Sequence, residues 1–153
     1  MINIEEMIEN DTDAIINLEK MIFSDPWSHQ SIEETFKQKQ AFILVAKSYE
    51  QVIGYCIVYY ALDQGEIARI AVHPQHQKAG VGCQLFTEVF KQCLTCGIEQ
   101  LFLEVRASNK AAISLYQKVG FATDGVRKNY YQDPLENAVQ MSNRCVSSIF
   151  FGK

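Results

Sequence analysis

The sequence changes its hydrophobic period at a pair of glycines near its middle. Residues 66–72, EIARIAV, have the apolar and β-branched composition of a strand. From Val81 onward apolar side chains recur every four residues, through Leu85 and Val89, as they do on one face of a helix. A polar loop, HPQHQKAG, leads from the strand into Gly80-Val81-Gly82. A strand that passes through a glycine loop into a long helix indicates an α/β fold.

The segments on either side of this loop extend the α/β order. Strands are predicted at 2–8, 41–47, 52–62, 66–72, 100–105, 121–128 and 137–146 from apolar runs and turn signals. Helices are predicted at 11–23 with Asp11 or Thr12 as cap, after Ser28 or Ser31, from Val81 to Gly97, and from Asn109 to Val119. The resulting order is βααβββαβαββ.

Length and charge restrict the class of protein. A chain of 153 residues is expected to form a single domain, residues 1–153. A net charge of -4 does not favour a nucleic-acid partner, and no apolar run reaches the length of a membrane span. The acidic N-terminus has no signal-peptide pattern, and five scattered cysteines fit a reducing compartment. We expect a cytoplasmic protein that binds neither nucleic acid nor membrane.

The glycine loop has the composition of a phosphate site. The first backbone N–H groups of a helix lack partners, and glycines let a phosphate approach them closely. Lys78 adds a positive charge. A Walker loop is absent, and a dinucleotide fingerprint would need a small residue at Leu85. On the glycines alone, a tight strand-to-helix turn without a ligand stays an alternative.

The longer phrase Gln77-Lys78-Ala79-Gly80-Val81-Gly82, after a central strand, resembles the acetyl-CoA loop of the GNAT superfamily of N-acetyltransferases. The resemblance covers nearly the whole chain in the same element order. Within the superfamily, LEVRASN at 103–109, AAISLYQKVGF at 111–121, RKNYY at 127–131 and DPWS at 25–28 are similar to the bacterial ribosomal-protein-alanine N-acetyltransferases (RimI). The resemblance implies the GNAT acyl-CoA N-acyltransferase fold, a mixed central sheet flanked by helices.

The resemblance also implies a binding site for acetyl-CoA as acetyl donor, without a metal. Backbone groups of the strand before the loop hold the pantetheine, and loop amides hold the diphosphate. The implied cofactor residues are Ile70, Ala71, Val72, Gln77, Lys78, Ala79, Gly80, Val81, Gly82, Cys83 and Asn109. Cys83 departs from many relatives, which carry Arg or Lys there, so one phosphate partner is missing.

Two side chains are candidates for proton transfer. Glu104 is expected to face away from Leu103 and Val105 on a regular strand, and the resemblance implies that it is the general base. Tyr116 in the LYQKVGF phrase is implied to be the general acid that protonates the departing thiolate. From spacing alone, a solvated carboxylate and a core tyrosine remain alternative interpretations.

The expected reaction is acetylation of the N-terminal alanine of a small-subunit ribosomal protein. An α-amine, with a pKa near about 8, is neutral far more often than lysine at about 10.4. Trp27 and Tyr131 are candidate walls of the peptide groove, and we expect a monomer or weak dimer. Acetylation of another N-terminus, a lysine or a small amine, and a non-catalytic acetyl-CoA sensor, remain alternatives. Cys93-x-x-Cys96 is interpreted as structural.

Overall fold

The computed structural model describes residues 1–151, so residues 152 and 153 of the predicted domain lie outside the described part. The chain divides into two compact units. The first contains Met1–Tyr59 and Ala68–Val89, and the second contains Tyr60–Ile67 and the chain from Phe90 onward. The single domain over residues 1–153 stays a prediction.

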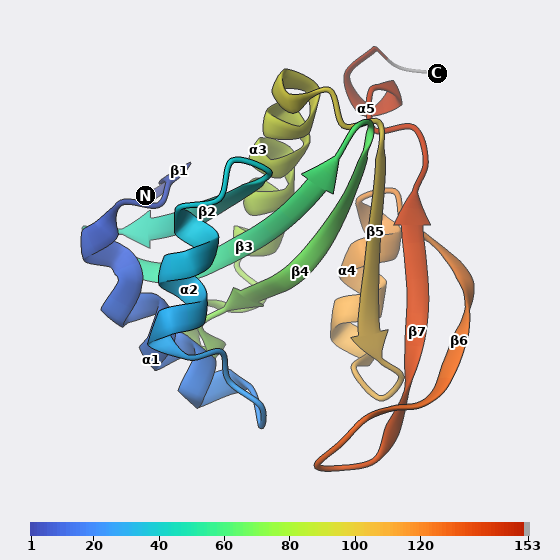
Figure 1. The fold of residues 1–153 in the computed structure, drawn as a ribbon, viewed down its shortest axis with the longest axis horizontal. Helices are drawn as coiled ribbons and strands as arrows, with labels where there is room; N and C mark the ends of the chain where they lie inside the picture. The colour runs from blue at the N-terminus through green and yellow to red at the C-terminus, as the bar shows by residue number, and fades with distance from the viewer. Residues whose placement is uncertain (152–153) are drawn as a thin grey trace. The chain divides into compact units, whose positions relative to one another are not determined.

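The elements follow the predicted order (Figure 1). They are β1 (Ile2–Glu6), α1 (Thr12–Ile22), α2 (His29–Phe36), β2 (Ala41–Ser48), β3 (Gln51–Ala61), β4 (Gln64–Val72), α3 (Val81–Cys96), β5 (Gln100–Arg106), α4 (Lys110–Lys118), β6 (Ala122–Tyr131) and β7 (Glu136–Asn143). Three short pieces were not predicted: the 3-10 turns η1 (Glu9–Asp11) and η2 (Pro74–His76), and the final turn α5 (Ser148–Phe151).

The strands form a mixed sheet, as predicted. They are hydrogen-bonded in the order β1-β2-β3-β4-β5-β7-β6. The β1–β2, β2–β3, β5–β7 and β6–β7 pairs are antiparallel, whereas β4 and β5 are parallel. The β4–β5 register covers Gln64–Glu66, so the C-terminal residues of β4 lie beyond it.

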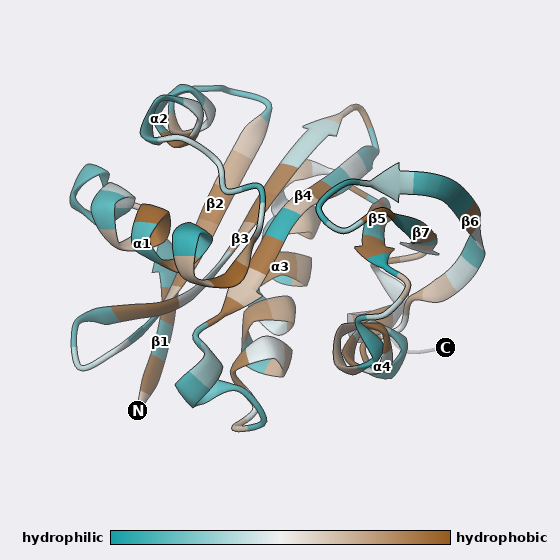
Figure 2. Ribbon diagram, turned by 90° about the horizontal axis from the view of Figure 1, so that it is seen from below, coloured by the Kyte–Doolittle hydropathy of each residue, from teal (hydrophilic) through white to brown (hydrophobic). Residues whose placement is uncertain are grey.

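The first unit buries apolar side chains on both faces of its strands. Ile43, Val45 and Ile57 belong to a core cluster with residues of α1 and α2. Ala46 and Ile53 instead pack with Val81 at the start of α3. Successive strand residues point to opposite faces, which explains the two clusters. Figure 2 shows the result, with β2 and β3 largely hydrophobic and α2 mostly hydrophilic.

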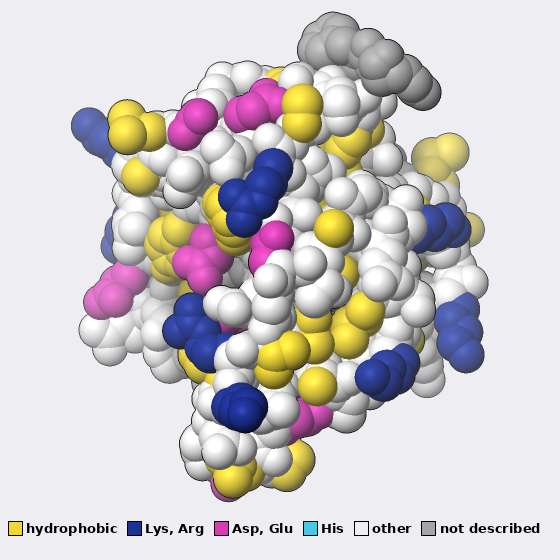
Figure 3. Space-filling model, turned by 90° about the vertical axis from the view of Figure 1, so that its right-hand side faces the viewer, with side chains coloured by type: hydrophobic (Ala, Val, Ile, Leu, Met, Phe, Trp, Pro, Cys, Tyr) yellow, Lys and Arg dark blue, Asp and Glu magenta, His cyan; other side chains and the backbone are white. Residues whose placement is uncertain are grey.

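In the second unit, the well-packed strand β5 contrasts with the exposed strand β6. In β5, Leu101, Leu103 and Val105 are buried and alternate with partly exposed residues, as predicted. The ring of Phe121 contacts those of Phe90 and Tyr116, with centroids 6.3 and 6.2 Å away. Strand β6 is exposed along nearly its whole length. The face on this side carries apolar side chains among separate Lys and Arg side chains (Figure 3).

The helix starts test the capping predictions. Ser28 caps α2, since its side-chain oxygen accepts the backbone N–H of Ser31 at 3.0 Å. Asp11 precedes α1, but its side chain makes no cap hydrogen bond there. Its carboxylate instead accepts the N–H of Ile8 at 2.9 Å and pairs with Lys47 at 3.1 Å. The predicted side-chain cap of α1 is therefore wrong, because a buried lysine and an earlier amide take that carboxylate.

No helix among the described residues combines the length and apolar character that a membrane crossing requires.

Candidate active site

The glycine loop ends where α3 begins. The backbone N–H of Gln84 donates to the carbonyl of Gly80 at 3.1 Å, which is the first bond of the helix. The amides of Val81, Gly82 and Cys83 therefore occupy the first turn, where an α-helix provides no acceptor for them. Gly80 has φ +83, and a Cβ at this position would meet no atom within 4 Å. The left-handed backbone conformation, and not a lack of space, is therefore the reason for glycine here.

The residues before Gly80 form an exposed turn fastened to the end of β4. The side-chain amide of Gln77 donates to the carbonyl of Val72 at 3.0 Å. The N–H of His73 donates to the carbonyl of Ile53 at 2.7 Å, which holds the chain against β3. Lys78 is exposed with φ 66, and Ala79 is exposed beside it. A helix N-terminus with an exposed lysine and an exposed turn fits a diphosphate group.

The end of β4 lies close to a glycine of β3. A Cβ built on Gly54 would come within 2.9 Å of the carbonyl oxygen of Ala71. Ala71 is buried, whereas Ile70 and Val72 are partly exposed. The three predicted pantetheine contacts, 70–72, thus lie on β4, whose backbone approaches β3 closely at Gly54.

Glu104 lies in a polar setting on β5. The Nε of Arg127 is 2.7 Å from one carboxylate oxygen, and the side-chain amide of Gln140 donates to the same oxygen at 3.4 Å. The glutamate side chain is 15% exposed. The negative charge of Glu104 is the largest cause that raises the pKa of Tyr130, followed by burial. The carboxyl group of Glu104 therefore has a cation, an amide and a phenol around it.

The sequence prediction missed the cation beside Glu104. Register explains the amide, because Gln140 lies directly opposite Glu104 in the β5–β7 pair. Arg127 comes from β6, two strands away in sheet order, and no local pattern marks it as a partner. The arginine of the RKNYY phrase was the one available signal.

Tyr116 and Asn109 both belong to the α4 region. Asn109 is the N-cap of α4, with its side-chain oxygen accepting the N–H of Ala112 at 3.2 Å, as predicted. Tyr116 is buried, 7% exposed, and its ring lies beside Phe121. Tyr116 thus contributes to a core. The sequence had left both a core role and an acid role open for this residue.

Trp27 lies in the segment between α1 and α2. Its backbone N–H donates to Oε1 of Glu19 at 2.8 Å. Its side chain borders a hollow of about 480 Å³. The hollow is lined by Pro26, Trp27, Ser28, Ser31, Glu34, Thr35, Gln38 and Tyr59. The position of Trp27 at this hollow is compatible with a wall of a groove.

Tyr131 ends β6 and lies under an arginine. The guanidinium carbon of Arg106 is 4.6 Å from the centroid of its ring, and the ring of Tyr130 meets it edge-on at 5.0 Å. Arg106 also donates to the carbonyl oxygens of Gln132 and Pro134 at 2.8 and 2.9 Å. A side chain of β5 therefore helps to hold the turn after β6.

The predicted site residues fall into two sets. The first unit contains Trp27, 70–72 and 77–83, and the second contains Glu104, Asn109, Tyr116 and Tyr131. Within the first, Gln77 and Val72 are in direct contact. Within the second, Tyr130 lies beside both Glu104 and Tyr131, which brings these two predicted residues near one another.

Comparisons with known proteins identify the family of the chain. The pattern of the Acetyltransferase (GNAT) family matches residues 12–121. The chain belongs to this family. A [ribosomal protein bS18]-alanine N-acetyltransferase of Haemophilus ducreyi is 35% identical over 144 residues, which cover 91% of this chain and 97% of the relative. The Escherichia coli K12 protein of the same name is 33% identical over 149 residues, covering 93% and 97%.

Solved structures show the GNAT fold as well. The crystal structure of the ribosomal-protein-S18-alanine N-acetyltransferase from Escherichia coli matches with a TM-score of 0.85 at 30% identity, covering 93% of this chain and 92% of that one. Ard1 from Thermoplasma volcanium matches with a TM-score of 0.84 at 24% identity, covering 92% and 95%. The predicted fold class is confirmed. Acetyltransferases of the GNAT family use acetyl-CoA.

The cysteine pair of this GNAT protein has the character of packing residues. Cys93 is fully buried, and burial, followed by the charge of Cys96, raises the pKa of its thiol to about 12. Both thiols are free. Among residues 1–151, no three His, Cys, Asp or Glu side chains gather in a group that could hold a metal ion.

Proposed function

We propose that this protein transfers the acetyl group of acetyl-CoA to the α-amino group of an N-terminal alanine on a small-subunit ribosomal protein. The observation that carries the proposal is the similarity to named bS18-alanine N-acetyltransferases over more than nine-tenths of the chain. Single-domain organisation over residues 1–153, monomer or weak-dimer assembly and a cytoplasmic setting are part of the same proposal.

The first unit supplies the donor site. In the proposal, the first-turn amides at Val81, Gly82 and Cys83, with Lys78, hold the diphosphate of acetyl-CoA. Gln77, Ala79 and Gly80 shape the loop. Backbone groups of 70–72 hold the pantetheine arm, and the Val72 N–H polarises the thioester carbonyl. One such oriented donor contributes about 3–4 kcal/mol to an acyl-transfer transition state. Asn109 is the cofactor contact proposed from the second unit.

Glu104 is the proposed general base. An N-terminal amine with a pKa of about 8 is roughly one-tenth neutral at pH 7, so it needs only a moderate base. The amine nitrogen forms a bond to the thioester carbonyl carbon and loses one proton to Glu104, directly or through a water. The carboxylate shown beside Arg127 and Gln140 is partly exposed, which is compatible with access for a small amine.

Tyr116 is the proposed general acid. When the bond between carbon and sulfur breaks, its phenol donates a proton to the thiolate, so amide and free thiol are the products. Tyrosine is protonated at neutral pH, with an ordinary pKa of about 10, and a thiolate near about 8.5 accepts from it only when the phenol is held close. Trp27 and Tyr131 are the proposed contacts of the acceptor peptide.

Mass spectrometry with labelled acetyl-CoA tests the reaction. The substrate is a peptide with the N-terminus of ribosomal protein bS18, and the control is the same peptide with a blocked α-amine. We expect one label on the free α-amine and none on the control. Label confined to lysine side chains, or no label at all, would contradict the proposed acceptor.

Two substitutions test the proton-transfer roles. Glu104→Gln and Tyr116→Phe are each expected to lower kcat by about 10²-fold or more, as loss of a general acid or base does. Acetyl-CoA binding, measured by calorimetry, should stay within about twofold because neither side chain belongs to the proposed diphosphate site. Glu6→Gln at an exposed position of β1 serves as a control. Turnover equal to wild type in both variants would refute the roles.

A further inference from the structure

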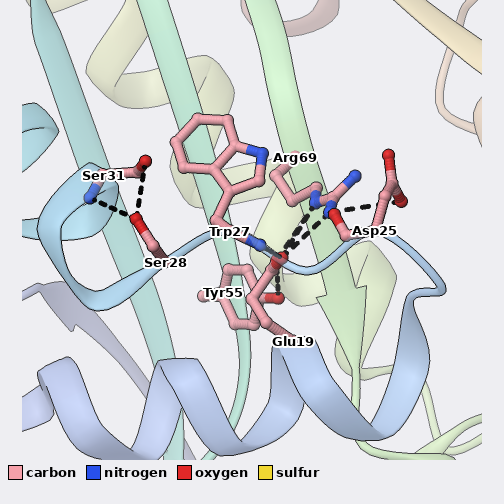
Figure 4. A network of polar contacts seen from close by, with 7 residues as sticks. All are labelled: Glu19, Asp25, Trp27, Ser28, Ser31, Tyr55 and Arg69. Atoms are coloured by element: carbon pink, nitrogen blue, oxygen red, sulfur yellow. Dashed lines mark hydrogen bonds and ion pairs between the residues drawn. The ribbon is translucent and has the colours of Figure 1, made fainter.

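A buried carboxylate joins three elements of the first unit. Glu19 lies in the last turn of α1 and is 0% exposed. Arg69 of β4 donates to it from Nε at 3.1 and 3.2 Å and from Nη2 at 2.9 Å. The hydroxyl of Tyr55 on β3 donates to Oε2 of the same carboxylate. We call Glu19, Tyr55 and Arg69 the Glu19 cluster (Figure 4).

The Glu19 cluster holds the segment between α1 and α2 at several points. The N–H of Trp27 donates to Glu19 at 2.8 Å. Arg69 Nη2 donates to the carbonyl of Asp25 at 2.7 Å, and its guanidinium carbon is 3.7 Å from the centroid of the Phe23 ring. Figure 4 shows the indole of Trp27 pointing away from the cluster. The backbone of residues 23–27 is therefore fixed, while Trp27 is partly buried against the core cluster and borders the hollow.

The cost of this arrangement indicates that it does more than fill the core. Burying a carboxylate is unfavourable, and a buried ion pair is often no more stabilising than apolar side chains of similar volume. A negative charge in the last turn of a helix also opposes the helix dipole. Burial and the charge of Glu19 raise the pKa of Tyr55 far above its ordinary value, so its hydroxyl remains a donor. We infer that the cluster fixes the positions of the elements that it joins.

We propose that Glu19 is a positioning residue that fixes Trp27 for the acceptor peptide. The proposal rests on the function proposed above. Arg69, which binds Glu19, directly precedes residues 70–72 on the same strand. One side chain thus touches the segment that carries the proposed peptide wall and belongs to the strand that carries the proposed donor contacts.

The chain provides its own reporter for this segment. Trp27 is the single tryptophan of the sequence, so intrinsic fluorescence at the red edge of excitation reports on the surroundings of its indole. If Glu19 is needed to hold Trp27, its replacement should shift the emission to longer wavelength and increase quenching by acrylamide. A cluster that only stabilised the unit would leave the emission of the folded protein unchanged.

The experiment compares Glu19→Gln with Asp11→Asn in the full-length protein. Asp11 is the matched control because it is 5% exposed and pairs with the buried Lys47 in the same unit. For Glu19→Gln we expect the KM for an N-terminal peptide to rise about tenfold or more, while kcat and the KM for acetyl-CoA change less than about threefold. Asp11→Asn should lower stability without moving the peptide KM or the emission.

A milder variant covers the case in which Glu19→Gln does not fold. Arg69→Lys keeps the charge and loses the planar fork, so it should show the same split between the two KM values at a smaller size. An unchanged peptide KM and emission in the folded variant would overturn the positioning role, as would equal effects in Asp11→Asn. Absence of α-amine acetylation by the wild-type protein would instead overturn the proposed function itself.

Discussion

Two arginines, one in each unit, hold the segments that carry the proposed peptide contacts. Arg69 binds a glutamate, a backbone carbonyl and an aromatic ring around residues 23–27. Arg106 binds Glu136 at 3.2 Å, the carbonyls of Gln132 and Pro134, and the ring of Tyr131. The same three kinds of partner therefore recur around each guanidinium.

The two arrangements differ in how far they exclude water. The side chains of Glu19 and Arg69 are 0% and 13% exposed, against 15% and 23% for Glu136 and Arg106. Electrostatic interactions weaken as solvent approaches. Breaking the buried Glu19–Arg69 pair of the first unit should therefore cost more free energy than breaking the more solvated Glu136–Arg106 pair of the second. The same contacts therefore imply a rigid segment at 23–27 and a more yielding turn at 132–135.

The largest difference is expected from removal of the buried carboxylate. Glu19→Ala removes the acceptor of the Arg69 Nε and of the Tyr55 hydroxyl, and we expect the unfolding free energy to fall by about 3–5 kcal/mol. Urea denaturation measures it. Asp13→Ala, an exposed acid in the first turn of the same helix that lies 3.3 Å from His29, should change it by less than about 1 kcal/mol. A loss below about 1 kcal/mol for Glu19→Ala would remove the contrast between the units.

Replacing each arginine by lysine should give intermediate effects of unequal size. Lysine keeps the charge but cannot reach two acceptors and stack on a ring at once. We expect a loss of about 2 kcal/mol for Arg69→Lys and about 1 kcal/mol or less for Arg106→Lys. Chemical denaturation of both variants under one condition gives the ranking. Equal losses would mean that burial does not separate the two arrangements.

The smallest effect concerns pH and the second unit. The hydrogen bond from Ser108 is the largest cause that lowers the pKa of Glu136, and Arg106 adds to it. A carboxylate with a lowered folded-state pKa contributes stability above its unfolded value, and this contribution is lost as pH falls through the folded value. The stability difference between wild type and Glu136→Gln should therefore be present at pH 7 and shrink in acid.

Urea midpoints of these two proteins at pH 7 and at about pH 3 measure the change, with the sign set by the linkage above. Lys128→Gln on the exposed strand β6 is a control for altered net charge. A difference that grows in acid would contradict the role of Glu136 as an ionised acceptor.

The element order was predictable because local signals determine it. Ser28 and Asn109 cap their helices, and α3 ends at Cys96 just before Gly97, as the sequence indicates. Asp11 failed as a side-chain cap because Lys47, 36 positions later, reaches its carboxylate in the fold. Local pattern has no information on such a competitor.

The candidate site was predictable to a similar extent. The sequence of the loop at 77–83 is itself the signal for that loop. Alternation along β5 places Glu104 on the opposite face of the strand from Leu103. The partners that set the chemistry around Glu104 and Glu19 come from distant strands, and the contact between Arg69 and Glu19 spans 50 positions. Nothing in the spacing of single charges indicates which of them meet, because packing of whole strands decides it.

Gly54 allows the backbone of β4 to lie close to β3. It belongs to no proposed contact, yet one added carbon there would strike the carbonyl of Ala71 at 2.9 Å. A methyl group would push the backbone of β4 outward at the place where a thioester is expected to rest. In a library of all single replacements, position 54 should therefore be depleted as strongly as a catalytic position. Selection would then act on residue 54 only because the hydrogen atom of glycine is small enough for the close approach of β4.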